Sequence, residues 1–348
     1  MKAKARFESK LDSEGFVRGA VPMTDEQIRH ALEMMLRSRA IDELAVKLQR
    51  LGRVGVYAPV HGQEAAVIGS AMALDPNRDW LVPAAREQPA MLHHGLPIES
   101  LFALYMGRLD FADIPEGVKL LPRQQAIAAQ IPHAAGLAWA LKLRGERAAV
   151  MVYCGDGASS EGDFHEGLNL AGVMGAPLIV VLVNNRYAIS TPFHKQTAAA
   201  SLAVRGEGYG MPGVAVNGND LFAVFSACKF AVKHALDGKG PYLIECQTYR
   251  LGFHNTSDNP AEYRDDAEVE AARVDDPVTK LAEYCLKTCL VSESDLSAMI
   301  SEVQVELRAA VRTVEALPRP GPDFIFKNVY ANLPLSLERQ LAKALEES

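Results

Sequence analysis

The chain has 348 residues and carries 36 Lys and Arg against 43 Asp and Glu, a net charge of −7. Apolar residues make up 49% and charged residues 23%, as in ordinary globular chains with a large core. The net acidity argues against nonspecific nucleic-acid binding, which needs Lys and Arg to neutralise phosphates. No apolar stretch reaches the roughly 20 residues that cross a bilayer, so no membrane helix is expected. The basic start lacks the apolar core of a signal peptide, which predicts a cytoplasmic protein.

The first part of the chain is predicted to hold an arm, two helices and a loop. Residues 1–23 are polar without a clear period, and we expect an N-terminal arm that docks elsewhere. A helix is predicted to begin at Thr24, where Gln27 completes a capping box, and to run to about residue 51. A helix rich in small residues should follow residues 61–64 and end near residue 74. Residues 109–122 are predicted to form a loop, and loops of that length are often functional.

The centre of the chain alternates apolar, strand-like runs with helices. Strands are predicted over residues 147–154 and 177–183, with a helix over 161–174 between them. Two buried strands joined by a helix indicate a right-handed β-α-β unit with parallel strands. The alternation continues through a strand at 214–216, a helix at 221–236 and a strand at 242–248. We therefore expect an α/β fold, a parallel sheet flanked by helices.

The C-terminal part is predicted to be helical, with a charged helix over residues 293–316 that a proline-rich stretch ends. The five scattered cysteines do not resemble a disulfide framework. Cys285 and Cys289 are expected to be two buried thiols on one helix face, since a metal site would need two more ligands. The predicted division is an arm over 1–23, an α/β cofactor-binding domain over 24–265 and a helical extension over 266–348.

Polar residues follow two of the predicted strands. Gly155-Asp156-Gly157-Ala158 comes after the first central strand, and Asn184-Asn185-Arg186-Tyr187 comes after the second. Ligands of open parallel sheets bind at the carboxyl ends of strands, and neighbouring strands lie about 4.8 Å apart. Asp156 and Asn185 can therefore face one ion, and their oxygens suit Mg²⁺ with diphosphate and water. The flanking glycines let the backbone approach a phosphate, and the next helix should direct its N-terminal amides toward that anion.

Two other interpretations of these motifs remain open. Asp-Gly and Asn-Asn pairs also occur in ordinary turns. A nucleotide site is the weaker hypothesis, because Gly155, Gly157 and Ser160 do not complete the G-x-G-x-x-G fingerprint and no G-x-x-x-x-G-K-[ST] stretch exists.

Two stretches of the sequence resemble a known family. Residues 155–191, GDGASSEGDFHEGLNLAGVMGAPLIVVLVNNRYAIST, resemble the thiamine diphosphate signature, which begins with Gly-Asp-Gly and closes with Asn-Asn. The flanks are similar to the alpha subunit of the decarboxylating component of 2-oxo acid dehydrogenase complexes. Residues 249–264, YRLGFHNTSDNPAEYR, resemble the active-site loop of that subunit, and most of all its branched-chain version. The likeness runs roughly from residue 25 to residue 330.

The resemblance implies thiamine diphosphate and Mg²⁺ as cofactors. Asp156, Asn185 and the carbonyl of Tyr187 would hold the metal ion. Arg86 would contact the diphosphate, Ile127 would support the bent cofactor, and His254 would be the catalytic residue that shuttles protons beside the thiazolium ring. The implied cofactor-binding residues together are Arg86, Ile127, Gly155, Asp156, Gly157, Ala158, Asn185, Tyr187 and His254.

The resemblance also implies an activity and partners. The reaction would be oxidative decarboxylation of a branched-chain 2-oxo acid, with acyl transfer to a lipoyl group, and pyruvate is the alternative substrate. A beta subunit would supply the glutamate that activates the cofactor, in an α₂β₂ heterotetramer, and a lipoyl acyltransferase core would be a further partner. The other alternative is a non-catalytic paralogue that binds partner subunits but no cofactor.

Several positions depart from the family pattern. Ala85 stands where a tyrosine usually precedes the phosphate-binding arginine, and the loop over residues 109–125 is shortened. Gln124 and Ala129 replace polar residues of a potassium site, although Gln130 remains, so the sequence does not support that site. Asn255 replaces a phosphorylatable serine, and control by a kinase at this position is not expected.

Overall fold

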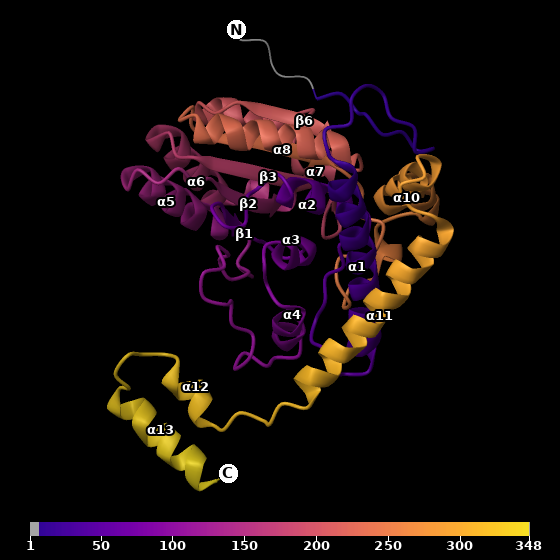
Figure 1. Cartoon of the computed structure of the whole chain (residues 1–348). Coiled ribbons are helices and arrows are strands. Elements are labelled where there is room, and N and C mark those ends of the chain that lie inside the picture. Colours follow the sequence, from indigo (N-terminus) through magenta and orange to yellow (C-terminus); the bar gives the residue numbers. More distant parts are fainter. Residues whose placement is uncertain (1–6, 348) are drawn as a thin grey trace.

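A computed structural model describes residues 7–347, so predictions for residues 1–6 of the arm lie outside the described part. Five strands form one parallel sheet in the order β1-β2-β3-β7-β6 (Figure 1). Their bounds are β1 Trp80–Val82, β2 Val150–Gly155, β3 Leu178–Asn184, β6 Gly213–Asn217 and β7 Tyr242–Gln247. The predicted α/β class and the parallel sheet flanked by helices are confirmed.

Both faces of the sheet are buried, which explains why its central strands are apolar throughout. Side chains alternate between the faces of a strand, so Met151 and Tyr153 enter one hydrophobic core while Val150 and Val152 enter the other. Helices α5 (Gln130–Leu143) and α6 (Gly162–Met174) cover the second face. Helix α8 (Leu221–Leu236), with α2 (Glu64–Ala71) packed on it, covers the first.

Helix α1 (Asp25–Arg50) begins where the capping box predicts. The Thr24 side chain accepts a hydrogen bond from the Gln27 amide, and Gln27 Oε1 accepts one from the Thr24 amide. Helices α10 (Pro277–Lys287) and α11 (Glu293–Glu315) pack along α1, as Figure 1 shows for α11. Their buried side chains join the same hydrophobic core as α8. The domain boundaries at residues 23 and 265 stay predictions.

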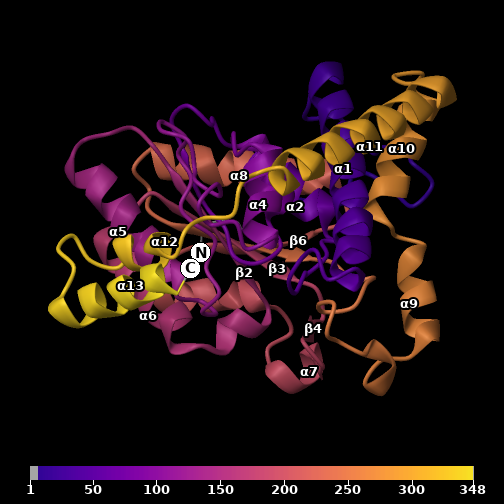
Figure 2. The ribbon, with the colours of Figure 1, turned by 90° about the horizontal axis from the view of Figure 1, so that it is seen from below.

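The remaining elements are short or lie outside the two cores. The predicted loop between α4 (Ile98–Tyr105) and α5 is irregular, but Leu120 forms an isolated parallel bridge with Leu81 of β1. Helices α12 (Asp323–Lys327) and α13 (Leu335–Glu346) project from the body of the molecule in Figure 1 and overlap α5 and α6 in the view of Figure 2. Neither helix has a buried side chain. The bounds are α3 Gln88–His93, α4 Ile98–Tyr105, η1 Gly157–Ser160, β4 Tyr187–Ala188, β5 Thr191–Pro192, α7 Phe193–Gln196, η2 Leu202–Tyr209, η3 Pro260–Glu262, α9 Asp266–Arg273, α12 Asp323–Lys327 and α13 Leu335–Glu346.

The described part of the N-terminal arm docks on α8 of the same chain. Oδ1 of Asp220 caps that helix by accepting from the amides of Phe222 (2.9 Å) and Ala223 (3.0 Å). Its Oδ2 accepts from the Ser9 hydroxyl (3.0 Å), the Leu11 amide (2.9 Å) and the Lys10 amide. Leu11 is only 1% exposed, so the arm adds to the core beside this carboxylate. The arm also contacts α10, where Lys287 donates from Nζ to the Glu14 carbonyl.

One prediction about the cysteines is wrong. Helix α10 ends at Lys287, before Cys289, which has a φ of 56° and is exposed, whereas Cys285 is buried. The Cys289 amide bonds to the Leu286 carbonyl, so the chain has already turned away from the helix axis. The two thiols therefore do not share a buried helix face. Across residues 7–347 all five cysteines are free, and none of the helices there combines the length and apolarity needed to cross a membrane.

Candidate functional site

A pocket of about 300 Å³ lies at the carboxyl ends of β2 and β3. It brings together every residue that the sequence predicts for the site, although their roles stay predictions: Arg86, Ile127, Gly155, Asp156, Gly157, Ala158, Asn185, Tyr187 and His254. These residues come from five separate stretches of the chain, so the fold and not the local sequence creates the pocket.

Asp156 and Asn185 lie at the same edge of the sheet because Gly155 pairs with Val183 in the parallel register. Asp156 is 2% exposed, and its Oδ2 accepts a 2.6 Å hydrogen bond from Nε2 of Gln196. Burial raises the pKa of Asp156, and the Gln196 amide opposes that rise. Asn185 donates from Nδ2 to Oε1 of Gln63 at 3.0 Å, which orients its amide group.

A single turn of 3₁₀-helix, η1, follows Asp156 and lines the pocket. The Ser159 hydroxyl closes this turn by donating to the Asp156 carbonyl at 2.6 Å. Helix α6 begins at Gly162, next to the predicted start at residue 161, so the backbone that follows Asp156 along the pocket belongs mainly to η1. Gly157 is needed for a close approach, because a Cβ atom there would lie 2.8 Å from Cβ of Ala188.

The carbonyl of Tyr187 is positioned by a small hairpin of β4 and β5. Arg186 and Ile189 flank β4 with φ values of 75° and 56°, a conformation that non-glycine residues rarely adopt. The buried Arg250 donates from Nη1 to the Tyr187 carbonyl at 3.2 Å and from Nη2 to the Ile189 carbonyl at 2.7 Å. Arg250 therefore holds the hairpin in place, and the Tyr187 oxygen keeps a second lone pair for another partner.

Arg86 and His254 meet on another side of the pocket. Arg86 donates from Nη1 to the Pro59 carbonyl (2.5 Å) and from Nη2 to the His254 carbonyl (2.7 Å), and Nη2 lies 3.0 Å from Nδ1 of the His254 ring. Burial, the largest cause, lowers the pKa of Arg86 to about 10 and that of His254 to about 4, and Arg86 adds to the shift at His254.

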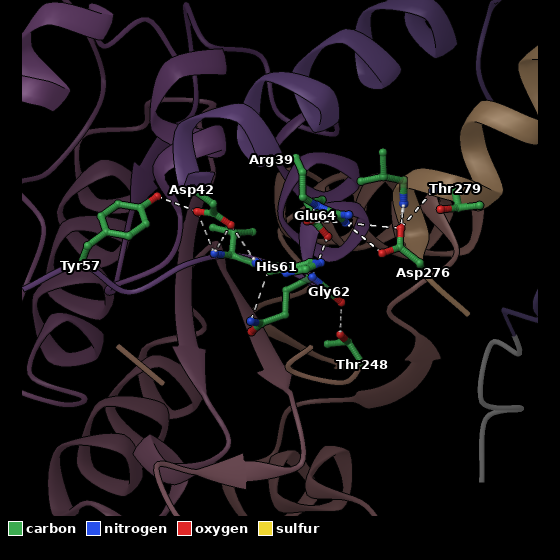
Figure 3. A network of polar contacts seen from close by, with 12 residues as sticks. Arg39, Asp42, Tyr57, His61, Gly62, Glu64, Thr248, Asp276 and Thr279 are labelled. Atoms are coloured by element: carbon green, nitrogen blue, oxygen red, sulfur yellow. Dashed lines mark hydrogen bonds and ion pairs between the residues drawn. The ribbon is translucent and has the colours of Figure 1, made fainter. Parts of the chain in front are cut away.

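Figure 3 shows the polar network that holds the segment over residues 57–63. Asp42 accepts from the Tyr57 hydroxyl (2.6 Å) and from the amides of Val60 (2.9 Å) and His61 (3.0 Å). Burial raises the pKa of Asp42 to about 7. Glu64 pairs with Arg39 at 2.8 Å and accepts from the Gly62 amide. This network places two groups used in the pocket, the Pro59 carbonyl and the Gln63 side chain.

Comparison with known proteins identifies the family. The model of the dehydrogenase E1 component matches residues 32–323. The chain belongs to this family. It is 39% identical over 319 residues to the pyruvate dehydrogenase E1 component subunit alpha of Staphylococcus aureus (strain Mu50), covering 91% of this chain and 86% of that one. It is 38% identical over 334 residues to the protein of the same name from Staphylococcus epidermidis (strain ATCC 12228), covering 95% and 90%.

Membership of the E1 family implies thiamine diphosphate, and the charges in the pocket fit that cofactor with a metal ion. Asp156 is a buried carboxylate that makes no ion pair within residues 7–347, and the half-buried guanidinium of Arg86 contacts the Pro59 carbonyl and His254 there instead of a carboxylate. Buried charges in proteins are paired or bind an ion. The oxygen donors at Asp156, Asn185 and Tyr187 suit a hard cation, and the guanidinium suits a phosphate group.

Two of the positions that depart from the E1 pattern, Ala85 and Gln124, line the pocket. Ala85 contributes only a methyl side chain to the pocket wall, and its carbonyl accepts a 3.4 Å hydrogen bond from Nη1 of Arg123. Gln130 is a lining residue as well. The curated relatives above are named for pyruvate, so the branched-chain type that the loop sequence favours is not confirmed.

Sequence reasoning missed three residues that orient the predicted ligands. Gln63 contacts Asn185, Arg250 contacts the Tyr187 carbonyl, and Gln196 contacts Asp156. Gln63 carried a usable signal, because it stands in a turn directly before a predicted helix, and Arg250 lies in the stretch that resembles the active-site loop. Gln196 lies in a polar segment with no pattern that points to a site.

Proposed function

We propose that this chain is the alpha subunit of a thiamine diphosphate-dependent 2-oxo acid dehydrogenase and that pyruvate is its substrate. The observation that carries the proposal is the pocket that holds a buried carboxylate without an ion pair, Asp156, together with a half-buried guanidinium without a carboxylate partner, Arg86. The names of the relatives support pyruvate. A branched-chain 2-oxo acid is the second candidate, supported by the loop sequence over residues 249–264.

The chain would bind the cofactor through its phosphate end. The Asp156 carboxylate, the Asn185 amide oxygen and the Tyr187 carbonyl would hold Mg²⁺. Arg86 would contact the diphosphate, with the backbone of Gly157 and Ala158 beside it. Ile127, which lines the same pocket, would support the cofactor through apolar contact.

When bound, thiamine diphosphate supplies the electron sink for loss of CO₂. In addition to that chemistry, the chain itself would supply a proton donor, the ring of His254. Arginine can only donate hydrogen bonds, so Nδ1 of His254 accepts from Arg86 and the neutral ring carries its proton on Nε2. With its pKa lowered to about 4, the ring is neutral near pH 7 and can donate from Nε2 to a reacting group.

We further propose that a beta subunit covers the pocket in an α₂β₂ heterotetramer, which then passes the acyl group to a lipoyl acyltransferase core. Ile127 and Ile189 line the pocket with 59% and 56% of their surfaces exposed, which supports a partner that buries them. The beta subunit would supply the glutamate that activates the cofactor. A cytoplasmic location stays a prediction.

The test is reconstitution with the beta subunit. CO₂ release from pyruvate and from 2-oxoisovalerate is measured for the chain alone and for the assembly, with thiamine diphosphate, Mg²⁺ and oxidised lipoamide as the acyl acceptor. We expect little activity from the chain alone and pyruvate turnover by the assembly. Full activity of the chain alone would refute the shared site, and preference for 2-oxoisovalerate would move the substrate to the branched-chain class. No Mg²⁺-dependent cofactor binding would favour the non-catalytic paralogue.

A further inference from the structure

Gln196 is brought to the pocket by a hairpin, although it lies 40 residues beyond Asp156 in the chain. It is the last residue of α7, which directly follows β5. Its Nε2 donates to Oδ2 of Asp156 at 2.6 Å and to the Thr191 carbonyl at 3.0 Å. The bond to the Thr191 carbonyl restrains the Gln196 side chain against its own hairpin. The side chain is therefore held in place where it donates to Asp156.

The orientation of the Gln196 amide is set by these two acceptors. A carboxylate and a carbonyl both require a donor, so a reversed amide would place Oε1 against two oxygens. The observed orientation leaves Oε1 buried and without a partner within the described residues, which normally costs free energy. The Gln196 amide therefore donates a hydrogen bond to Asp156, while its own Oε1 accepts none within the described residues.

A neutral amide is the partner that a metal-binding carboxylate needs. An arginine or lysine beside Asp156 would neutralise the charge and compete with a cation. Gln196 instead makes one hydrogen bond to Oδ2, and Oδ1 makes no side-chain hydrogen bond within residues 7–347. Groups that hydrogen-bond to metal ligands fix ligand orientation, and their loss typically lowers metal affinity by about 10- to 100-fold.

We propose that Gln196 is a positioning residue for the Mg²⁺ site, holding Oδ2 of Asp156 so that Oδ1 faces the ion. This inference rests on the proposed function, in which Asp156 is a metal ligand. Gln63 stands in the corresponding relation to Asn185, so each of the two side-chain ligands is oriented by one glutamine.

The test measures Mg²⁺ affinity by isothermal titration of the assembly with its beta subunit, in the presence of thiamine diphosphate. We expect Gln196→Ala to lower Mg²⁺ affinity by about 10- to 100-fold. At saturating Mg²⁺ and cofactor, kcat should stay within a few-fold of wild type, because the ligand itself remains. Gln196→Met, which keeps the length but not the donor, should show the same loss and covers the case that the alanine variant does not fold.

His194→Ala is the matched control, since His194 is an exposed residue of the same short helix. Its Mg²⁺ affinity should equal that of wild type. Wild-type affinity in both Gln196 variants would overturn the positioning role. Asp156→Ala separates the two levels of the argument: if it too keeps wild-type Mg²⁺ affinity, the proposed metal site itself fails, whereas loss in Asp156→Ala alone refutes only the role of Gln196.

Discussion

Nη2 of Arg86 lies 3.0 Å from Nδ1 of His254 and 2.7 Å from the backbone oxygen of the same residue. One guanidinium thus contacts both the ring and the backbone of the loop that resembles the active-site loop of E1 alpha subunits. The contact to the backbone does not depend on the identity of the side chain at residue 254. Cofactor binding through Arg86 and proton transfer through His254 can therefore be separated by mutation.

We predict that His254→Ala leaves cofactor affinity within a few-fold of wild type and slows acyl transfer to lipoamide by about 100-fold or more. Arg86 keeps its bonds to the Pro59 and His254 carbonyls in this variant, whereas the proton on Nε2 is lost. Cofactor titration and lipoamide reduction by the reconstituted assembly measure the two effects. Ser257→Ala, at an exposed position of the same loop, serves as the control. Wild-type turnover of His254→Ala would contradict the assigned role.

We predict that Asp156→Ala leaves the unfolding free energy of the cofactor-free chain nearly unchanged. Burial raises the pKa of Asp156, so its ionised form opposes folding at neutral pH and its removal offsets the lost Gln196 bond. Urea denaturation at pH 7 should give an unfolding free energy within about 1 kcal/mol of wild type.

The same variant should lose the stabilisation that cofactor binding gives. At a cofactor concentration of about 100 times Kd, binding adds about 2.7 kcal/mol to the wild-type assembly, and Asp156→Ala should gain almost none of it. Asp163→Ala, in the first turn of α6 and outside the pocket lining, should keep the gain. Equal stabilisation of Asp156→Ala and wild type by thiamine diphosphate and Mg²⁺ would show that Asp156 does not bind the metal.

The sequence predicted the parts of the fold that depend on local patterns. The capping box at Thr24 located the start of α1, and the apolar runs located β2 and β3, because both sheet faces are buried. Strand β1 has three residues and β4 and β5 have two each, which is too short for a period to be read. Cys289 was placed wrongly because the end of α10 depends on how the chain turns at residue 288.

The candidate site was predictable as far as it follows strand ends. Asp156 and Asn185 stand directly after parallel strands, and their meeting follows from that topology alone. The approach of Gln196 depends on the hairpin between Asn185 and Gln196, where Arg186 and Ile189 adopt positive φ values without being glycine. Nothing in a composition or a period indicates such a conformation, so tertiary structure is needed to find this residue.

Asp220 gives a prediction about the arm. We expect Asp220→Ala to lower the unfolding free energy by about 2 to 4 kcal/mol, because it removes the cap of α8 together with the bonds to residues 9–11. Trypsin should also cleave after Lys10 faster than in wild type, since the arm is released. Asp237→Ala removes exposed ion pairs with Lys233 and Lys239 and should leave the unfolding free energy nearly unchanged. An arm as protease-resistant in Asp220→Ala as in wild type would refute the anchor.

The last prediction concerns acid sensitivity and the pair of His30 on α1 and His93 on α3. Nε2 of His30 lies 3.1 Å from Nδ1 of His93, and burial, with further contributions from His30 and His94, lowers the pKa of His93 to about 4. The unfolded chain binds a proton at this residue near pH 6.5, so between pH 6.5 and 4 it holds more protons than the folded chain. The neutral His93 ring therefore makes its full contribution to the unfolding free energy above pH 6.5, and this contribution is lost as the pH falls toward 4.

We expect His93→Asn, which keeps an acceptor but does not titrate, to reduce the loss of stability between pH 7 and pH 5 by up to about 2 kcal/mol. Urea denaturation at a series of pH values measures this difference. Part of the acid sensitivity should remain, because the pKa values of His61 and His254 are also lowered to about 4, mainly by burial. His133→Asn, at an exposed position of α5, is the control and should follow the wild-type curve. Parallel pH curves for wild type and His93→Asn would show that the histidine pair does not set this sensitivity.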